Sequence, residues 1–324
     1  MTHGSRNVIL VADGAPDDHF TAADLPRAVR RLCAWKGGSD GIYFVRDAAD
    51  GTADAWFFNP DGSPALLCGN GMRAAGRLVL DRHQVDETVL RTGPYSFTVR
   101  AAGSTAQGVR QVAVELPAVD FTPRDPIVAG VAWPYVDQAN PAYSSRRTVT
   151  ALAVPNSHLI TLVDRYDEDE LVTTGSRVAG DSAAFPLGAN VSFVQRLGED
   201  EVFIRTFERG AGLTESCGSG VSASRATLSR LGLADPGTRV LVRNPGGPCR
   251  SWLQRTGDAW QPVLEGNATV MLRAEVGTAD VLGDAPLDVA VEAFGDETEA
   301  FDALFQDNLK ALRAAGIDPA VATV

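Results

Sequence analysis

Lysine is almost absent from the sequence. Among 29 lysine and arginine residues, only Lys36 and Lys310 are lysines. An enzyme that uses pyridoxal phosphate needs a lysine to form the Schiff base with its cofactor. Lys36 lies at an expected helix-to-loop junction and Lys310 in an expected peripheral helix, and neither is beside a phosphate-binding glycine loop. The sequence therefore argues against the usual cofactor route to amino-acid chemistry.

Cysteine and histidine are also few. The four cysteines (Cys33, Cys68, Cys217 and Cys249) are too few for a disulfide scaffold in a chain of 324 residues. No Cys-x-x-Cys or His-x-x-x-His spacing occurs, so the sequence predicts no metal site.

Long apolar runs and dense basic runs are missing as well. No stretch approaches the roughly 20 apolar residues that a membrane helix needs. Residues 1–20 lack a charged head followed by an apolar block, so no signal peptide is predicted. The net charge of −12 argues against a nucleic-acid partner. We therefore expect a cytoplasmic protein that binds a small molecule; the sequence leaves a homodimer open.

The pattern of strands and helices occurs twice. In each half, two strands lead to a Cys-Gly-x-Gly turn that opens a helix, over residues 72–81 and 221–231, and further strands follow. The cysteines of the two turns, Cys68 and Cys217, are 149 positions apart, which predicts an internal duplication. We place the halves at 1–130 and 131–277. An extension over 278–324, with an amphipathic helix over 293–315, has no counterpart in the first half.

The two turns carry the candidate chemistry. A helix N-terminus favours the thiolate form of a cysteine, and glycines leave the backbone N–H groups open to a carboxylate. If both turns held one amino-acid carboxylate, the α-carbon would lie between the sulfurs of Cys68 and Cys217. One thiolate would then remove the α-proton while the other thiol protonates the opposite face. The N–H groups would stabilise the enolate-like intermediate.

A structural interpretation of each turn stands beside the catalytic one. A single Cys-Gly-x-Gly is more often a buried small residue that precedes a helix, but two copies at equivalent positions favour catalysis. Cys33 and Cys249 lack this setting and are predicted to be structural. His3, His19 and His83 are interpreted as surface residues.

Two long segments resemble the diaminopimelate epimerase family. The first contains Phe58-Asn59-Pro60-Asp61-Gly62-Ser63 and Cys68-Gly69-Asn70-Gly71-Met72-Arg73. The second runs through Phe207-Glu208-Arg209-Gly210-Ala211-Gly212 to Cys217-Gly218-Ser219-Gly220. Weaker matches, at 3–7, 39–41, 155–158 and 189–191, extend the resemblance from about residue 3 to 277. Proline racemases lack the Glu-Arg-Gly-Ala-Gly lead-in, and phenazine-biosynthesis-type isomerases lack the cysteine pair.

The resemblance implies an α+β fold of two similar domains, each an antiparallel sheet curled around a central helix. It implies Cys68 and Cys217 as the acid–base pair and no cofactor, and it implies a role in lysine and cell-wall synthesis. The reacting carboxylate would be bound by Gly69, Asn70, Gly218 and Ser219. The distal end of the substrate would be bound by Asn59, Asn156, Asn190, Glu208 and Arg209. Asn7 and His158 are further expected substrate-binding residues.

Three departures from the family pattern leave the substrate open. Val8-Ile9 replaces the family's Asp-Phe after Asn7, Ser157 replaces a proline, and the extension from 278 lies outside the resemblance. The first hypothesis is epimerisation of L,L-diaminopimelate to the meso form. The second is racemisation of another amino acid by the same cysteines. A binding protein that has lost catalysis is the third, and the retention of both cysteines argues against it.

Overall fold

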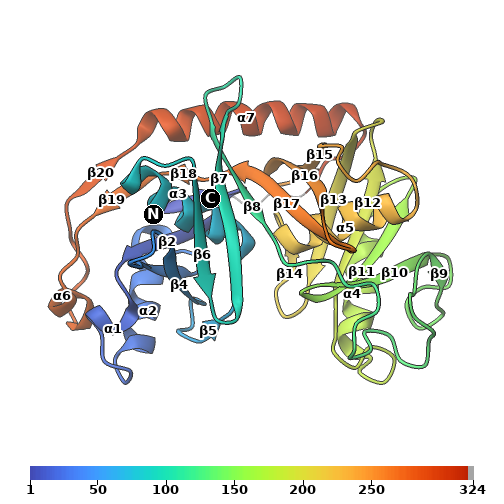
Figure 1. Ribbon diagram of the computed structural model, residues 1–324, viewed down its shortest axis with the longest axis horizontal. Helices are drawn as coiled ribbons and strands as arrows, with labels where there is room; N and C mark the ends of the chain where they lie inside the picture. The colour runs from blue at the N-terminus through green and yellow to red at the C-terminus, as the bar shows by residue number, and fades with distance from the viewer. Residues whose placement is uncertain (320–324) are drawn as a thin grey trace. The chain divides into compact units, whose positions relative to one another are not determined.

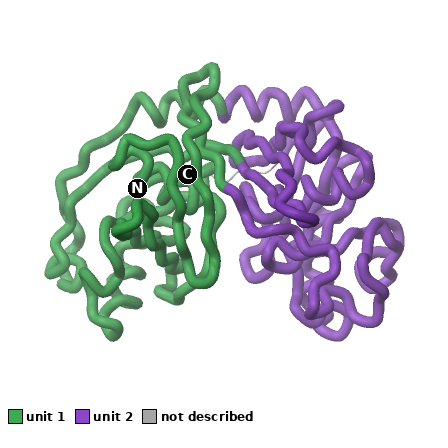
Figure 2. The backbone as a smooth tube through the Cα atoms, viewed as in Figure 1, with its two compact units in different colours: residues 1–114, 265–304 green, residues 115–264, 305–324 purple. Residues whose placement is uncertain are grey.

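A computed structural model describes residues 1–319 and divides into two compact units (Figures 1 and 2). Unit 1 comprises residues 1–114 and 265–304, and unit 2 comprises residues 115–264 together with the described residues from 305. The predicted division at 130 and 277 differs from these bounds, because the chain returns to unit 1 after residue 264. The last five residues of the predicted extension, 320–324, lie outside the described residues.

Unit 1 is built around a mixed sheet. Its elements are β1 (Thr2–Gly4), β2 (Asn7–Asp13), α1 (Pro16–His19), α2 (Leu25–Cys33), a 3-10 turn (Trp35–Gly37), β3 (Ile42–Asp47), β4 (Ala53–Phe58), β5 (Pro64–Ala65), α3 (Gly69–His83), β6 (Glu87–Thr92), β7 (Tyr95–Ser104), β8 (Arg110–Glu115), β18 (Thr269–Val270), β19 (Leu272–Ala274), α6 (Thr278–Leu282) and β20 (Val291–Ala293).

Unit 2 is also a mixed sheet with helices. Its elements are β9 (Gln138–Ala139), β10 (Thr148–Val154), β11 (Asn156–Val163), α4 (Glu168–Gly180), β12 (Asn190–Arg196), β13 (Glu201–Glu208), β14 (Gly212–Thr214), α5 (Gly218–Arg230), β15 (Val240–Asn244) and β16 (Gly247–Thr256). The strand β17 (Ala259–Asn267) and the helix α7 (Gly295–Ala314) contain residues of both units, and β8 ends one residue inside unit 2, at Glu115.

The two sheets repeat one pairing order, which supports the predicted duplication. In unit 1, β2 pairs in parallel with β3, β3 antiparallel with β4, and β4 in parallel with β6. In unit 2 the same relations join β11 with β12, β12 with β13, and β13 with β15. The expected antiparallel sheet is therefore mixed in both units. A parallel pair needs a crossover, and α3 and α5 provide it after β4 and β13.

The helices that follow the cysteines are the central helices of their units (Figure 1). Most residues of α3 and α5 are buried, so their side chains must be apolar, small or internally hydrogen-bonded. A Cβ on Gly76 of α3 would come within 2.3 Å of Val99 on β7. In α5, Ser222 and Ser224 donate to the carbonyls of Gly218 and Gly220. Small residues thus let each helix lie close to its sheet.

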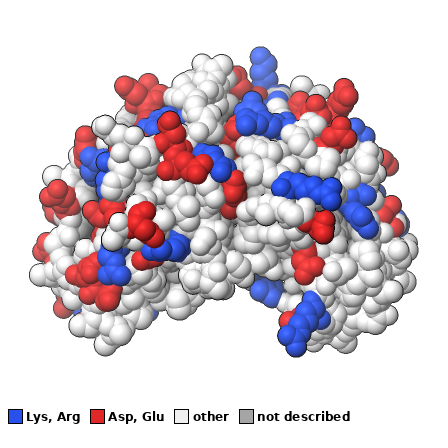
Figure 3. All heavy atoms as spheres, in the orientation of Figure 1, with Lys and Arg blue, Asp and Glu red and all other residues white. Residues whose placement is uncertain are grey.

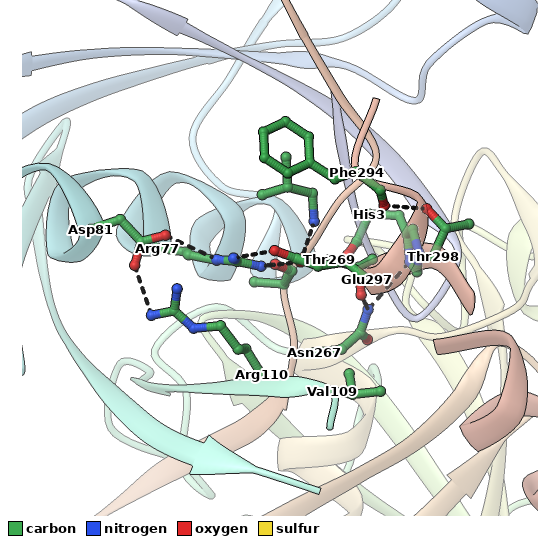
Figure 4. Close-up of polar contacts among 12 residues, drawn as sticks. His3, Arg77, Asp81, Val109, Arg110, Asn267, Thr269, Phe294, Glu297 and Thr298 are labelled. Atoms are coloured by element: carbon green, nitrogen blue, oxygen red, sulfur yellow. Dashed lines mark hydrogen bonds and ion pairs between the residues drawn. The ribbon is translucent and has the colours of Figure 1, made fainter. Parts of the chain in front are cut away.

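Helix α7 confirms the expected amphipathic helix. Four of its apolar residues are buried: Phe301, Phe305, Leu309 and Leu312. Its first turn is fixed by Glu297, which hydrogen-bonds both terminal nitrogens of Arg77 on α3, at 2.5 and 2.6 Å (Figure 4). Glu297 also accepts the backbone N–H of Val270. The extension therefore packs against its own chain, and its first turn is tied to the helix that begins after Cys68.

One histidine interpretation is wrong. His3 is buried rather than on the surface: its ring lies 4.3 Å from that of Phe301, and its Nδ1 lies 3.2 Å from Asn267 Nδ2. Burial, followed by the charges of Arg6 and Arg73, lowers the pKa of His3 to about 4. His19 and His83 are exposed, as expected.

Candidate active site

In unit 1, Cys68 is the N-cap of α3. Its backbone is extended (φ −124°, ψ 111°), and its Sγ accepts the backbone N–H of Gly71 at 3.4 Å. This is the placement in which unpaired N–H groups and the helix dipole favour a thiolate. The Cys68 side chain is partly exposed. The glycine turn predicted to bind a carboxylate is therefore a true helix N-terminus.

A hydrogen-bonded chain positions Asn7 beside Cys68. The Sγ of Cys68 lies 3.4 Å from Asn7 Oδ1, and Asn7 Nδ2 donates to Asp40 Oδ2 at 2.8 Å. The same Asp40 oxygen accepts the N–H of Val8 at 2.7 Å. Because the carboxylate takes the amide nitrogen, the amide oxygen of Asn7 is the atom directed toward the sulfur. Burial raises the pKa of Asp40, and the bonds from Val8 and Asn7 oppose that rise.

Arg73 fixes the side chain of Asn70 through a hydrogen bond. The Nη2 of Arg73 donates to Asn70 Oδ1 at 3.0 Å, and its Nε donates to the carbonyl of Asn267 at 3.0 Å. A Cβ on Gly4 would come within 2.8 Å of Arg73, so the glycine leaves room for the guanidinium. Asn267 Oδ1 in turn accepts the N–H of Ser5. This network joins the Cys68 turn to Ser5, in the turn that precedes Asn7.

In unit 2, Cys217 caps α5 in the same way but in a different electrostatic setting. Its Sγ accepts the N–H of Gly220 at 3.4 Å and lies 3.5 Å from Ser219 Oγ. Burial, followed by the negative charge of Glu208, raises the pKa of Cys217 well above its usual value. Burial also raises the pKa of Glu208, which accepts the Thr214 hydroxyl at 2.6 Å. Glu208 therefore interacts with the second cysteine.

The other predicted residues of unit 2 form two local pairs. Buried Asn190 accepts the backbone N–H of Arg209 at 2.9 Å, and the Arg209 guanidinium bonds to the carbonyl of Leu187. Exposed Asn156 lies 3.1 Å from Nε2 of His158. Burial lowers the pKa of His158 to about 3, so its ring is neutral at physiological pH. The His158 Nδ1 is buried and has no hydrogen-bond partner among residues 1–319.

Asn59 hydrogen-bonds within its own turn and not to Cys68. It follows β4, and its Nδ2 donates to Ser63 at 3.0 Å within a tight turn. The structure thus groups Asn7 and Asn70 with Cys68, and Glu208 and Ser219 with Cys217. Gly69 and Gly218 are the first residues of α3 and α5.

Sequence reasoning did not assign a role to Tyr43, Asp40, Arg73 or Asn267. The recognised segments contained Arg73 and Asp40 but gave no contact for either. No sequence motif marked Tyr43 or Asn267 as a functional residue. Their contacts depend on strand register and on the return of the chain to unit 1.

The part of the chain that the structure describes offers no metal centre and no membrane-spanning helix. No group of three or more His, Cys, Asp or Glu side chains in residues 1–319 could hold a metal ion. No helix within these residues is long and apolar enough to cross a membrane. On the face shown in Figure 3, acidic and basic side chains are interspersed, without the broad basic surface that a nucleic acid would need.

Known proteins resemble this chain over most of its length. The family model described as diaminopimelate epimerase matches residues 150–271. The diaminopimelate epimerase of Listeria welshimeri is 34% identical over 303 residues, which cover 90% of this chain and 92% of that protein. The diaminopimelate epimerase of Enterococcus faecalis is 32% identical and covers 87% of this chain and 90% of its own length.

These matches correct one expectation about the extension. A match over 90% of the chain exceeds the fraction that precedes residue 278, so the similarity reaches into the extension. At least part of the extension is therefore shared with the Listeria welshimeri relative.

The fold also occurs among solved structures. A Bacillus anthracis phenazine biosynthesis protein of the PhzF family matches with a TM-score of 0.57 at 13% identity. The match covers 78% of this chain and 87% of that one. At this identity the likeness concerns the fold alone, and it confirms the two-domain α+β class that was expected.

Proposed function

Because the chain belongs to the diaminopimelate epimerase family, we propose that it converts L,L-diaminopimelate to meso-diaminopimelate by a two-base exchange of the α-proton. Membership makes it an isomerase that acts on amino acids. The observation that carries the two-base mechanism is the pair of cysteine N-caps, each with a sulfur at the start of a buried glycine-led helix.

The two cysteines differ in a way that suits opposite roles. Cys217 is buried beside Glu208, and both surroundings favour its neutral thiol. Cys68 is partly exposed at a helix terminus that favours a thiolate, and Asn7 Oδ1 accepts a hydrogen bond from its Sγ when the sulfur is protonated. In the proposed cycle Cys68 removes the α-proton and Cys217 delivers its proton to the opposite face. Glu208 keeps Cys217 protonated until that delivery, and the reverse reaction exchanges the roles.

The remaining residues would bind the two ends of the substrate. The N–H groups at Gly69, Asn70, Gly218 and Ser219 would receive the reacting carboxylate as it becomes enolate-like. Arg209 offers a bidentate fork for the distal carboxylate, and Asn59, Asn156 and Asn190 offer amide groups for that end. No step requires a cofactor.

The test is proton NMR of L,L-diaminopimelate with the reduced protein in deuterated water. Formation of meso product with α-deuterium is the expected result. Cys68→Ala and Cys217→Ala should each lower this activity at least about 1,000-fold, because each removes an acid–base group. Cys33→Ala, far from both turns in the sequence, is the matched control.

Two outcomes would contradict the proposal. Full activity in either cysteine variant would rule out the two-base mechanism. Exchange with other amino acids, and none with diaminopimelate, would keep the mechanism and reject the substrate. The replacement of the family's Asp-Phe by Val8-Ile9 next to Asn7 is the feature that favours this second candidate, racemisation of another amino acid.

A further inference from the structure

Tyr43 lies beneath the Cys68 turn and contacts it through its hydroxyl. The hydroxyl accepts the backbone N–H of Cys68 at 3.0 Å and donates to the backbone carbonyl of Cys68 at 3.3 Å. One side chain therefore binds the peptide groups on both sides of the Cys68 α-carbon.

The position of the Tyr43 ring is fixed by close packing. The side chain is fully buried on β3, and its ring lies 4.8 Å from the ring of Phe57 on β4. A Cβ on Gly71 would come within 2.7 Å of the ring, so the ring directly supports the first turn of α3. A hydroxyl on a ring held in this way is a rigid hydrogen-bonding group.

The contacts of Tyr43 hold the backbone from which the Cys68 sulfur projects. The two peptide planes that flank an α-carbon set the direction of its Cα–Cβ bond. The Sγ also contacts the N–H of Gly71 and the amide oxygen of Asn7. Proton transfer requires such placement, because a misplacement of about 1 Å can cost about 100-fold in rate.

The second turn is supported differently at the equivalent place. Ile42 faces Phe58 in the β3–β4 pair, and Val191 faces Phe207 in the β12–β13 pair. The residue after Val191, Ser192, thus takes the place of Tyr43. Its hydroxyl bonds to Thr206 at 2.8 Å, not to the backbone of Cys217. The two halves of the duplication therefore differ in the residue that packs against each cysteine turn.

From this geometry we infer that Tyr43 is a positioning residue for Cys68, and that it acts through the Cys68 backbone rather than on the substrate. The inference rests on the proposed function for its effect on catalysis. Its effect on the sulfur itself does not depend on which amino acid the enzyme converts.

The experiment compares Tyr43→Phe with Tyr143→Phe. Tyr143 is also fully buried, and its hydroxyl bonds to Thr161 at 2.7 Å in unit 2. Each variant removes one buried hydroxyl and keeps the ring, so each should lower Tm by a few degrees. Only Tyr43→Phe should lower kcat, by about 10- to 100-fold, with KM changed less than about twofold.

The second readout is the rate at which iodoacetamide alkylates Cys68 without substrate, followed by mass spectrometry. Tyr43→Phe should slow this reaction several-fold, because the sulfur leaves the helix N-terminus that favours the thiolate. The rate at Cys217 in the same sample is the internal reference. A wild-type protein inactive on every amino acid would reject the proposed function and leave this readout intact. Unchanged kcat and unchanged Cys68 alkylation in Tyr43→Phe would overturn the inference.

Discussion

At the scale of single residues, the two cysteines share a backbone setting but not an electrostatic one. Each is an N-cap whose sulfur accepts the N–H three residues later, at 3.4 Å. Cys217 is buried against the carboxyl group of Glu208, whereas Cys68 is partly exposed. A two-base reaction needs one thiolate and one thiol at a time, and in the proposed cycle this difference makes Cys217 the thiol.

Glu208→Gln tests that difference. Burial would still raise the pKa of Cys217 in the variant, but the negative charge that adds to the rise would be gone. Alkylation of Cys217 should therefore reach half its maximal rate at a lower pH than in the wild type, and kcat should fall about 100-fold. Exposed Glu199→Gln is the control. An unchanged pH dependence of Cys217 alkylation would show that Glu208 does not act on this thiol.

The sequence identified both cysteines and Glu208 because they lie in long, distinctive segments. Tyr43 and Asp40 act on Cys68 from strand β3 and the turn before it, about 25 residues away in sequence. Their roles depend on the parallel register of β2 and β3, which places Leu10 opposite Ile42. A sequence motif of a few residues does not specify the register between two strands. The contacts of Tyr43 and Asp40 therefore could not be predicted from the sequence motifs.

At the scale of elements, helices that follow a recognisable glycine turn or have a clear apolar face were predicted, and others were missed. Helix α7 was expected from its regularly spaced Phe and Leu residues. Helix α4 was not, because only Leu171 and Val178 are apolar among its buried positions. The other two are Thr174 and Gly175, and a Cβ on Gly175 would come within 2.3 Å of Phe207. Because close packing against β13 requires a glycine at this position, the buried face of α4 lacks the regular apolar pattern that predicts a helix.

The ion pair between Glu297 of α7 and Arg77 of α3 allows a test of how α7 contributes to stability. Burial alone would raise the pKa of Glu297, but the bonds from Arg77 and the Val270 N–H hold it below its usual value of 4.5. Its contribution to stability is therefore complete above about pH 4.5 and is lost as pH falls through the lower, folded-state pKa.

Glu297→Gln should lower the free energy of unfolding at pH 7 by about 2 kcal/mol, and Tm by about 5 °C, because Arg77 loses a charged partner. The difference from the wild type should shrink in acid. Thermal denaturation at several pH values measures both effects. Glu299→Gln, an exposed change on the same helix, is the control. Equal losses in the two variants would mean that the contact with Arg77 adds no stability.

At the scale of the whole molecule, each unit is assembled from segments distant in sequence. Unit 1 needs residues from 265 to 304, and unit 2 takes up the chain again at 305. The sequence predicted two halves and an extension because a duplication shows itself as the same order of elements repeated along the chain. Which segment completes which core depends on tertiary packing. The division within α7 shows this, since Phe301 packs against His3, and Leu312 against Phe203.

This division predicts that the two halves of α7 stabilise different units. Phe301→Ala and Leu312→Ala should each cost about 3 kcal/mol, because both side chains are buried. In hydrogen-exchange mass spectrometry, Phe301→Ala should speed exchange mainly in 1–114, and Leu312→Ala mainly in 115–264. Exposed Asp302→Ala should change neither. If both variants instead speed exchange evenly throughout, the chain opens as one cooperative unit, and the two compact units are not independent in stability.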